Sequence, residues 1–105
     1  MSLSEQEFRV RSDEALDGAR HALLPLADQE GFEVELQNGV LNLVFEEPSE
    51  TKFVISPNAP VRQVWVSAMA RSYKLAWVPV TQAFVLGDET LPQLLERLTR
   101  EFLSR

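Results

Sequence analysis

Carboxylate side chains crowd the first half of this sequence, and the chain's one histidine stands among them. Glu14, Asp17 and His21 are spaced i, i+3 and i+7, so on a helix they would share one face exposed to solvent. Carboxylate and imidazole groups are ligands that hard cations accept. Because an exposed helix face fixes its ligands poorly and Arg20 adds a positive charge, the spacing predicts a weak cation site or an ordinary charged face.

Two further carboxylates, Glu33 and Glu35, are spaced two apart in the stretch FEVELQ. Side chains at i and i+2 of a β-strand point to the same side, so this pair could meet a cation or a basic loop of another protein. Charges at a sheet edge also steer association over long range, and for that reason we favour the basic partner. The alternative is an ordinary solvated edge of a sheet.

The stretch APVRQVWVSA alternates so that a tryptophan is placed on one side of a predicted strand. Gln63, Trp65 and Ser67 fall on one face of that strand, whereas Val64 and Val66 fall on the other. If the valines face the core, the indole lies among polar side chains, and soluble proteins seldom expose a large aromatic ring to water. Since tryptophan is enriched at the centres of protein interfaces, Trp65 is a candidate docking residue.

A purely structural role for Trp65 is the alternative. Val44 and Val54 are predicted on the same outer face, and an indole lying across them would stabilise the sheet through cross-strand contact. The exposed position among polar residues favours the interface over this reading.

The rest of the sequence contains few residues or motifs that indicate an enzyme. There is no cysteine, which excludes disulfides, thiolate metal sites and a cysteine nucleophile. A single histidine, no glycine-rich phosphate loop and no spacing suited to a Ser-His-Asp arrangement argue against a self-sufficient enzyme. We therefore expect a binding protein with no tightly bound cofactor.

Charge is unevenly distributed along the 105 residues, whose net charge is −6. Residues 1–50 hold 12 acids against 3 bases, whereas residues 51–105 hold 4 acids against 7 bases. An acidic first half disfavours nucleic acid and anionic membranes as partners and favours cations or a basic protein surface. No apolar run approaches the ~20 residues that cross a bilayer, and the start lacks a signal-peptide pattern, so we expect a cytoplasmic protein.

The carboxylates of the first segment need a helix to position them. Ser4 followed by Glu7 is a capping box, which predicts that a helix begins there, and Pro25 should end it near Leu24 because a proline nitrogen cannot donate to the preceding turn. The predicted buried stripe is Phe8, Ala15, Ala19, Ala22, Leu23 and Leu26.

A hairpin and a second helix follow. Asn38 and Gly39 tolerate the positive φ angles of a type I′ turn, and the flanking strands should direct Phe32, Val34, Leu36, Leu41, Leu43 and Phe45 inward. Thr90 and Gln93 form another capping box near the end of the chain. The apolar stripe of this closing helix is Leu91, Leu94, Leu95, Leu98 and Phe102.

The order of these elements predicts a single α+β domain spanning residues 1–105. About six short strands joined by tight turns imply a mainly antiparallel sheet, and two amphipathic helices would bury their stripes on one face of it, as in a two-layer α/β sandwich. The other face then meets water. Its expected side chains are Glu33, Glu35, Asn42, Lys52, Ser56, Gln63, Trp65 and Ser67.

The stretches NGVLNLVF, FVIS and above all PVRQVWVS resemble the frataxin family, in particular its bacterial, CyaY-type members. The similarity runs from SEQEF in the first helix to GDETLPQLLERL at the second and so covers nearly the whole chain. The resemblance implies an α-β sandwich with both helices on one sheet face, in a monomeric bacterial protein.

The resemblance also implies a role in iron–sulfur cluster assembly, through binding of a complex between a cysteine desulfurase and a scaffold protein, with weak binding of Fe²⁺ or Fe³⁺. The partner-binding residues so implied or predicted are Gln63, Trp65, Ser67, Asn42, Ser56, Glu33 and Glu35. An acidic ridge along the first helix and first strand would supply the candidate metal ligands Asp13, Glu14, Asp17, His21, Asp28, Glu30 and Glu33.

This chain departs from its relatives at several of these positions. Arg20, His21, Leu24 and Pro25 stand where bacterial frataxins carry carboxylates, which thins the acidic ridge. Ser56 replaces a family asparagine, and the tryptophan expected near Gln82 is absent, with Phe84 and Trp77 as nearby substitutes.

Two other functions stay open at this point. An iron carrier or weak ferroxidase would use the carboxylates of the first helix and first strand. An acidic α/β chaperone for secreted proteins would also be small and acidic, although such chaperones depend on exposed apolar patches that form dimers.

Overall fold

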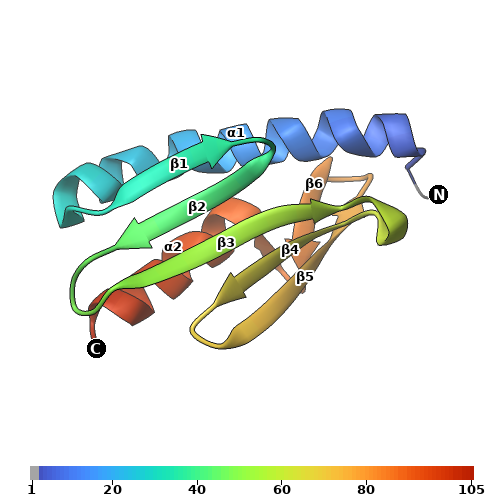
Figure 1. Cartoon of the computed structure of the whole chain (residues 1–105). Coiled ribbons are helices and arrows are strands. Elements are labelled where there is room, and N and C mark those ends of the chain that lie inside the picture. The colour runs from blue at the N-terminus through green and yellow to red at the C-terminus, as the bar shows by residue number, and fades with distance from the viewer. Residues whose placement is uncertain (1–2) are drawn as a thin grey trace.

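A computed structural model describes residues 3–105, which form two helices and one curled antiparallel sheet (Figure 1). The elements are α1 (Glu5–Glu30), β1 (Glu33–Gln37), β2 (Val40–Phe45), β3 (Thr51–Asn58), a short 3-10 helix η1 (Ala59–Val61), β4 (Gln63–Ala68), β5 (Arg71–Val78), β6 (Ala83–Leu86), β7 (Glu89–Thr90) and α2 (Leu91–Leu103). Neighbours in sequence are neighbours in the sheet, and every pairing is antiparallel. The predicted α+β class is confirmed.

Seven strands are present in the described part of the chain, where the sequence predicted about six. The additional strand is β7, two residues long, in which Glu89 and Thr90 pair with Leu86 and Val85 of β6. So short a segment carries no alternation that sequence reasoning could detect. It forms because the chain must turn at Gly87 before Thr90 caps α2.

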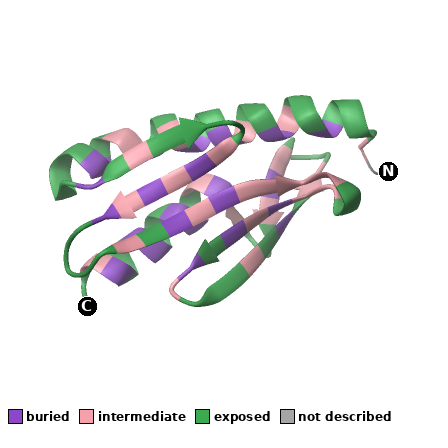
Figure 2. Cartoon of the chain, viewed as in Figure 1, coloured by how far each residue is buried: buried purple, intermediate pink, exposed green. Residues whose placement is uncertain are grey.

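Both helices cover the same face of the sheet, as predicted. Every second residue of β2 and β4 is buried, as are Phe53 and Ile55 of β3, and these side chains join the buried stripes of α1 and α2 in one hydrophobic cluster (Figure 2). The strand residues of this cluster are Leu41, Leu43, Phe45, Phe53, Ile55, Val64, Val66, Ala68, Leu75 and Phe84. The opposite face of the sheet is therefore left open.

Helix α1 begins as predicted but ends later. The Ser4 hydroxyl accepts from the Glu7 N–H at 3.1 Å, and the Glu7 carboxylate accepts from the Ser4 N–H at 3.0 Å. The prediction of an end near Leu24 is wrong, because Pro25 lies inside the helix, which continues to Glu30. Burial of the side chains beyond Pro25 offsets the hydrogen bond that this residue cannot donate.

Gly31 provides the actual end of α1. Its φ of 79° places it in the left-handed region, and its N–H donates to the Ala27 carbonyl at 2.8 Å. This is the C-terminal cap that glycine adopts most readily. The extension carries Asp28 and Glu30 onto the helix.

Individual burial predictions for the first third of the chain are partly wrong. Ala22 is exposed, and Ser12 and Leu16 are buried in the stripe instead. Leu36 is 37% exposed and Val34 only half-buried, since β1 is an edge strand that the helices cover incompletely.

The remaining turn and cap predictions are confirmed. Asn38 and Gly39 have φ angles of 54° and 76°, and Gln37 pairs with Val40 across this two-residue turn. The Thr90 N–H donates to the Gln93 side chain at 2.9 Å at the start of α2. The five predicted apolar residues of α2 are all buried.

Candidate functional site

Trp65 lies on the open face of the sheet. Its neighbours along β4, Val64 and Val66, are completely buried beneath the helices, and the alternation of the strand turns Trp65 the opposite way, where it is half-buried. The predicted orientation of this strand is confirmed.

Two side chains hold the indole of Trp65 in place. Its Nε1–H donates a hydrogen bond of 2.9 Å to the Oε1 atom of Gln63. The ammonium group of Lys74 lies 4.8 Å from the centre of the indole ring, within the range of a cation–π contact. The residues paired directly with Trp65 on β3 and β5 are Ser56 and Lys74, so its nearest cross-strand neighbours are polar and not the valines of the structural alternative.

All seven predicted partner-binding residues lie on this outer face. Ser56 pairs with Trp65, and Asn58 with Gln63. One row of paired positions across the sheet runs through Glu35, Asn42, Val54 and Ser67, and Glu33 pairs with Val44. Trp65 and Gln63 occupy the middle of the face, whereas Glu33 and Glu35 lie on its edge strand.

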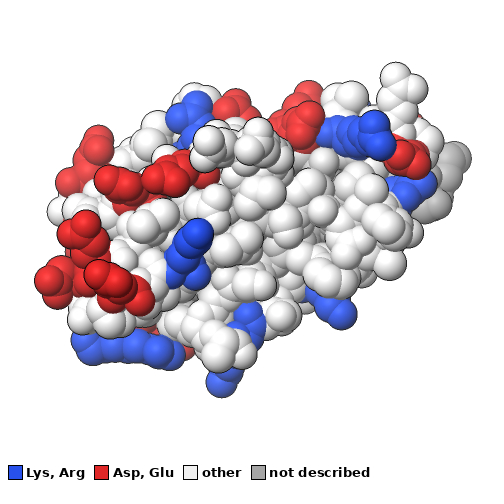
Figure 3. All heavy atoms as spheres, viewed as in Figure 1, with Lys and Arg blue, Asp and Glu red and all other residues white. Residues whose placement is uncertain are grey.

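Charge divides the same face into two regions. Figure 3 shows a largely uncharged centre, with acidic side chains gathered toward the end where α1 finishes, β1 starts and the β2–β3 turn lies. We call this region the acidic end and define it by Asp28, Glu30, Glu33, Glu35, Glu46, Glu47 and Glu50. The sequence did not single out the last three, because they lie outside the predicted first helix and first strand.

The candidate metal ligands of α1 do not gather into a metal site. Among residues 3–105 no group of three or more His, Asp or Glu side chains is placed to hold a metal ion. Glu14 instead pairs with Arg11 at 3.1 Å, and Asp17 pairs with Arg20 at 3.4 Å and with His21 at 3.5 Å. Asp13 is exposed on the same helix. The arginines therefore compete with a cation for two of the three predicted ligands.

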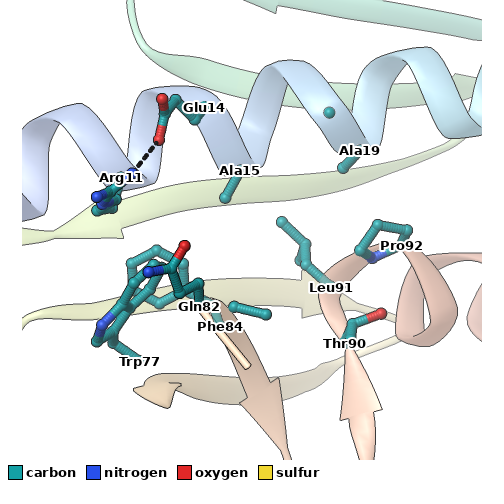
Figure 4. Close-up of a pocket in the computed structure, with 12 residues that line it drawn as sticks. Arg11, Glu14, Ala15, Ala19, Trp77, Gln82, Phe84, Thr90, Leu91 and Pro92 are labelled. Carbon is teal, nitrogen blue, oxygen red and sulfur yellow. Dashed lines mark hydrogen bonds and ion pairs between the residues drawn. The ribbon is translucent and has the colours of Figure 1, made fainter. Parts of the chain in front are cut away.

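A hollow of about 290 Å³ opens between α1, the β5–β6 hairpin and the start of α2 (Figure 4). Phe84 is buried at its base and meets Trp77 edge-on, with ring centres 5.2 Å apart. The Arg11 guanidinium lies 5.6 Å from the centre of the Trp77 ring. These two aromatic residues occupy the region where a family tryptophan was expected, and they form the wall of a hollow rather than a part of the outer face.

An ion pair ties β7 to α2. Arg97 donates two hydrogen bonds, of 2.7 and 2.9 Å, to the two carboxylate oxygens of Glu89. These hydrogen bonds lower the pKa of Glu89 and raise the pKa of Arg97. The contact lies away from the outer face and supports the fold rather than the candidate site.

Within residues 3–105 the two helices are too short or too polar to cross a lipid bilayer.

Comparison with known proteins places these features in a family. The family model of the frataxin-like domain matches residues 1–105. Iron-sulfur cluster assembly proteins CyaY from Ectopseudomonas mendocina and Pseudomonas syringae are each 30% identical over 105 residues, covering 96% of this chain and 90% of theirs. A solved frataxin from Psychromonas ingrahamii has the same fold, with a TM-score of 0.69 at 16% identity over 94% of this chain and 90% of its own. The chain therefore belongs to the frataxin family and is similar to the bacterial CyaY proteins named above.

Proposed function

We propose that this protein binds a complex of cysteine desulfurase and scaffold protein and thereby regulates iron–sulfur cluster assembly. The observation that carries the proposal is the orientation of Trp65, which turns away from the two helices onto the open sheet face. Iron–sulfur cluster assembly is the process named for the CyaY relatives. The resemblance of PVRQVWVS to the family supplies the partners.

The surface around Trp65 has the properties of a docking site. The large aromatic ring of Trp65 lies on the outer face next to Gln63 and Ser56, and such residues contribute most of the free energy in many protein interfaces. The hydrogen bond to Gln63 satisfies the indole N–H and holds the ring before a partner arrives. A pre-ordered side chain loses less conformational entropy on binding.

The acidic end is proposed to meet a basic surface of the same complex. Glu33 and Glu35 point to the outer side of β1 and, within residues 3–105, form no ion pair with a lysine or arginine. Carboxylates free of internal partners attract a positively charged surface over about 8–10 Å in physiological salt. They would therefore accelerate encounter and orient the docking of Trp65.

Weak contact with Fe²⁺ at the acidic end is a secondary part of this proposal. Two carboxylates on one side of β1 can share an ion but leave most of its coordination to water, so the affinity should be low. Anaerobic titration with Fe²⁺ tests it by NMR. Line broadening confined to Glu30, Glu33 and Glu35 is expected, and the absence of localised broadening would remove iron from the account.

The proposal assigns the protein no catalytic step. Two of the carboxylates that a ferroxidase would use on α1, those of Glu14 and Asp17, are engaged by arginines. Regulation then acts through the partner's own chemistry, by occupying or reshaping its surface.

Reconstitution with purified desulfurase and scaffold tests the main proposal. Calorimetric titration should give saturable binding to the desulfurase–scaffold complex, and the rate of cluster formation should change when the chain is added. No binding to the complex, or to either component, together with an unaltered rate of cluster formation would contradict the proposed function.

A further inference from the structure

The positive charges of the protein fall into two groups. Five arginines form ion pairs with carboxylates, and these are Arg9, Arg11, Arg20, Arg97 and Arg100. The other five cations have no carboxylate of residues 3–105 within ion-pairing distance, and these are Lys52, Arg62, Arg71, Lys74 and Arg105. Lys52 is on β3, and Arg71 and Lys74 are on β5. Three of the five unpaired cations therefore lie on the strands that flank β4, which carries Trp65.

Two of these cations border a shallow hollow of about 280 Å³ at the β4–β5 turn. Lys52 and Arg71 lie on its rim together with the side chains of Ser67 and Ser72. The two serines are paired directly across β4 and β5, so both face outward with Trp65. The hollow and the indole therefore belong to one continuous surface.

Four polar side chains of this hollow have no hydrogen-bond partner among the described residues. No side-chain hydrogen bond is formed by Lys52, Arg71 or either serine within residues 3–105. An ammonium group, a guanidinium group and two hydroxyls can all donate hydrogen bonds. A group of donors without an acceptor, two of them positively charged, is suited to an anion.

We propose that this hollow is a carboxylate-binding subsite, which receives an aspartate or glutamate side chain from the protein partner that covers Trp65. The inference rests on the proposed function and specifies the partner's chemistry. The partner would present an apolar contact for the indole and, a few residues away, one or two carboxylates for Lys52 and Arg71.

A protein segment fits this subsite better than a longer polyanion. The chain carries a net charge of −6, and Glu35 of the acidic end lies in the same row of outer-face positions as Ser67 of the hollow. Nucleic acid or an anionic membrane would extend toward those carboxylates and be repelled by them. A short acidic segment can pair with Arg71 and Lys52 and end there, without extending past Lys52 to Glu46 and Glu50 beside it.

The carboxylates of the acidic end and the cations around the hollow would also fix the orientation of docking. The acidic end attracts a basic surface, and the subsite attracts an acidic segment, so a partner turned by 180° would meet like charges at both places. Trp65 then supplies affinity between them, whereas the charges select one orientation.

Peptide titration followed by NMR tests the subsite directly. The probe is the acetylated, amidated dipeptide Glu-Glu, and the matched neutral probe is the Gln-Gln dipeptide. We expect Glu-Glu, but not Gln-Gln, to shift the amide signals of residues 67–72 and of Lys52. Equal shifts from both peptides, no shifts, or shifts from inorganic phosphate but not from Glu-Glu would overturn the proposal.

Charge-matched variants separate the subsite from general electrostatics. The double variant Lys52→Gln/Arg71→Gln should abolish the shifts, whereas Arg9→Gln/Arg100→Gln, which removes the same charge from other exposed positions, should retain them. Loss of the shifts in both double variants, or in neither, would contradict a localised site.

The same variants distinguish failure of the subsite from failure of the proposed function. Lys52→Gln/Arg71→Gln should weaken binding to the desulfurase–scaffold complex by about tenfold, and the control pair by less than about twofold. If Trp65→Ala weakens binding and Lys52→Gln/Arg71→Gln does not, the subsite is wrong and the proposed function stands. If the unaltered chain does not bind the complex, the proposed function is wrong, and the peptide titration still decides the subsite.

Discussion

The indole N–H of Trp65 donates a hydrogen bond of 2.9 Å to the side-chain oxygen of Gln63, which lies two residues earlier on the same face of β4. This contact links two residues that the strand's period of two already places side by side. It removes the need for the indole N–H to find a partner in water or in another protein. The exposed ring is thus held in a defined position at the centre of the proposed docking surface.

Replacing Gln63 with alanine should release this constraint. The indole N–H would turn to water and the ring would become more mobile, so binding to the desulfurase–scaffold complex should weaken by about 0.5–1.5 kcal/mol in calorimetric titration. Gln37→Ala, at an exposed position on β1, is the matched control and should leave the affinity unaltered. Equal affinities for the two variants would mean that the hydrogen bond has no part in docking.

Val64, the next residue along β4, should show the opposite behaviour. Its side chain is fully buried under the helices, so Val64→Ala should lower the free energy of unfolding in urea by about 2 kcal/mol. The affinity of the folded variant for its partner should stay close to that of the original chain. A large loss of affinity without loss of stability would contradict the assigned faces of this strand.

The faces of β4 could be predicted from sequence because alternation is a local property. The same holds for the turn at Asn38 and Gly39 and for the capping box at Ser4, each of which depends on residues a few positions apart. Local chemistry also indicated that both helices bury one stripe.

The end of α1 could not be predicted in this way. Pro25 is a strong local signal to stop, but Leu26 and Ala27 find places in the core and Gly31 offers a suitable cap. Burial of these side chains against the rest of the fold determines where α1 ends, and this burial cannot be read from the local sequence.

Two features of the candidate site likewise depend on the three-dimensional arrangement of the side chains and could not be predicted from the sequence. Glu46, Glu47 and Glu50 join the acidic end because the β2–β3 turn lies near the end of α1 (Figure 1). The pairing of Glu14 with Arg11 and Asp17 with Arg20 removes ligands that spacing alone had grouped together. Competition among neighbouring side chains is settled by rotamers, which spacing does not specify.

The acidic edge should control the rate of association. Glu33→Gln/Glu35→Gln should slow association with the desulfurase–scaffold complex severalfold at low salt, measured by stopped-flow mixing, because it removes two charges that attract the partner. The difference should shrink as salt is added. Glu96→Gln/Glu101→Gln removes the same charge from α2 and serves as the control. Equal slowing by both pairs would assign the effect to net charge alone.

The Glu89–Arg97 pair should make part of the stability dependent on pH. Hydrogen bonding by Arg97 lowers the pKa of Glu89 in the folded protein. The contribution of this pair to the free energy of unfolding is therefore complete above the ordinary pKa of glutamate and is lost as the pH falls through the lowered pKa. Glu89→Gln should therefore be less stable than the original chain near neutral pH. In acid the two urea midpoints should converge. A stability difference that stays constant down to low pH would contradict this linkage.

Trp65→Ala gives the most direct test of the central claim, which is that this exposed indole is the principal contact with another protein. Calorimetric titration should show binding to the desulfurase–scaffold complex weakened by about 2 kcal/mol or more, whereas thermal unfolding should be nearly unaltered, because the ring lies outside the core. Unaltered affinity, or unfolding of the variant, would contradict the account.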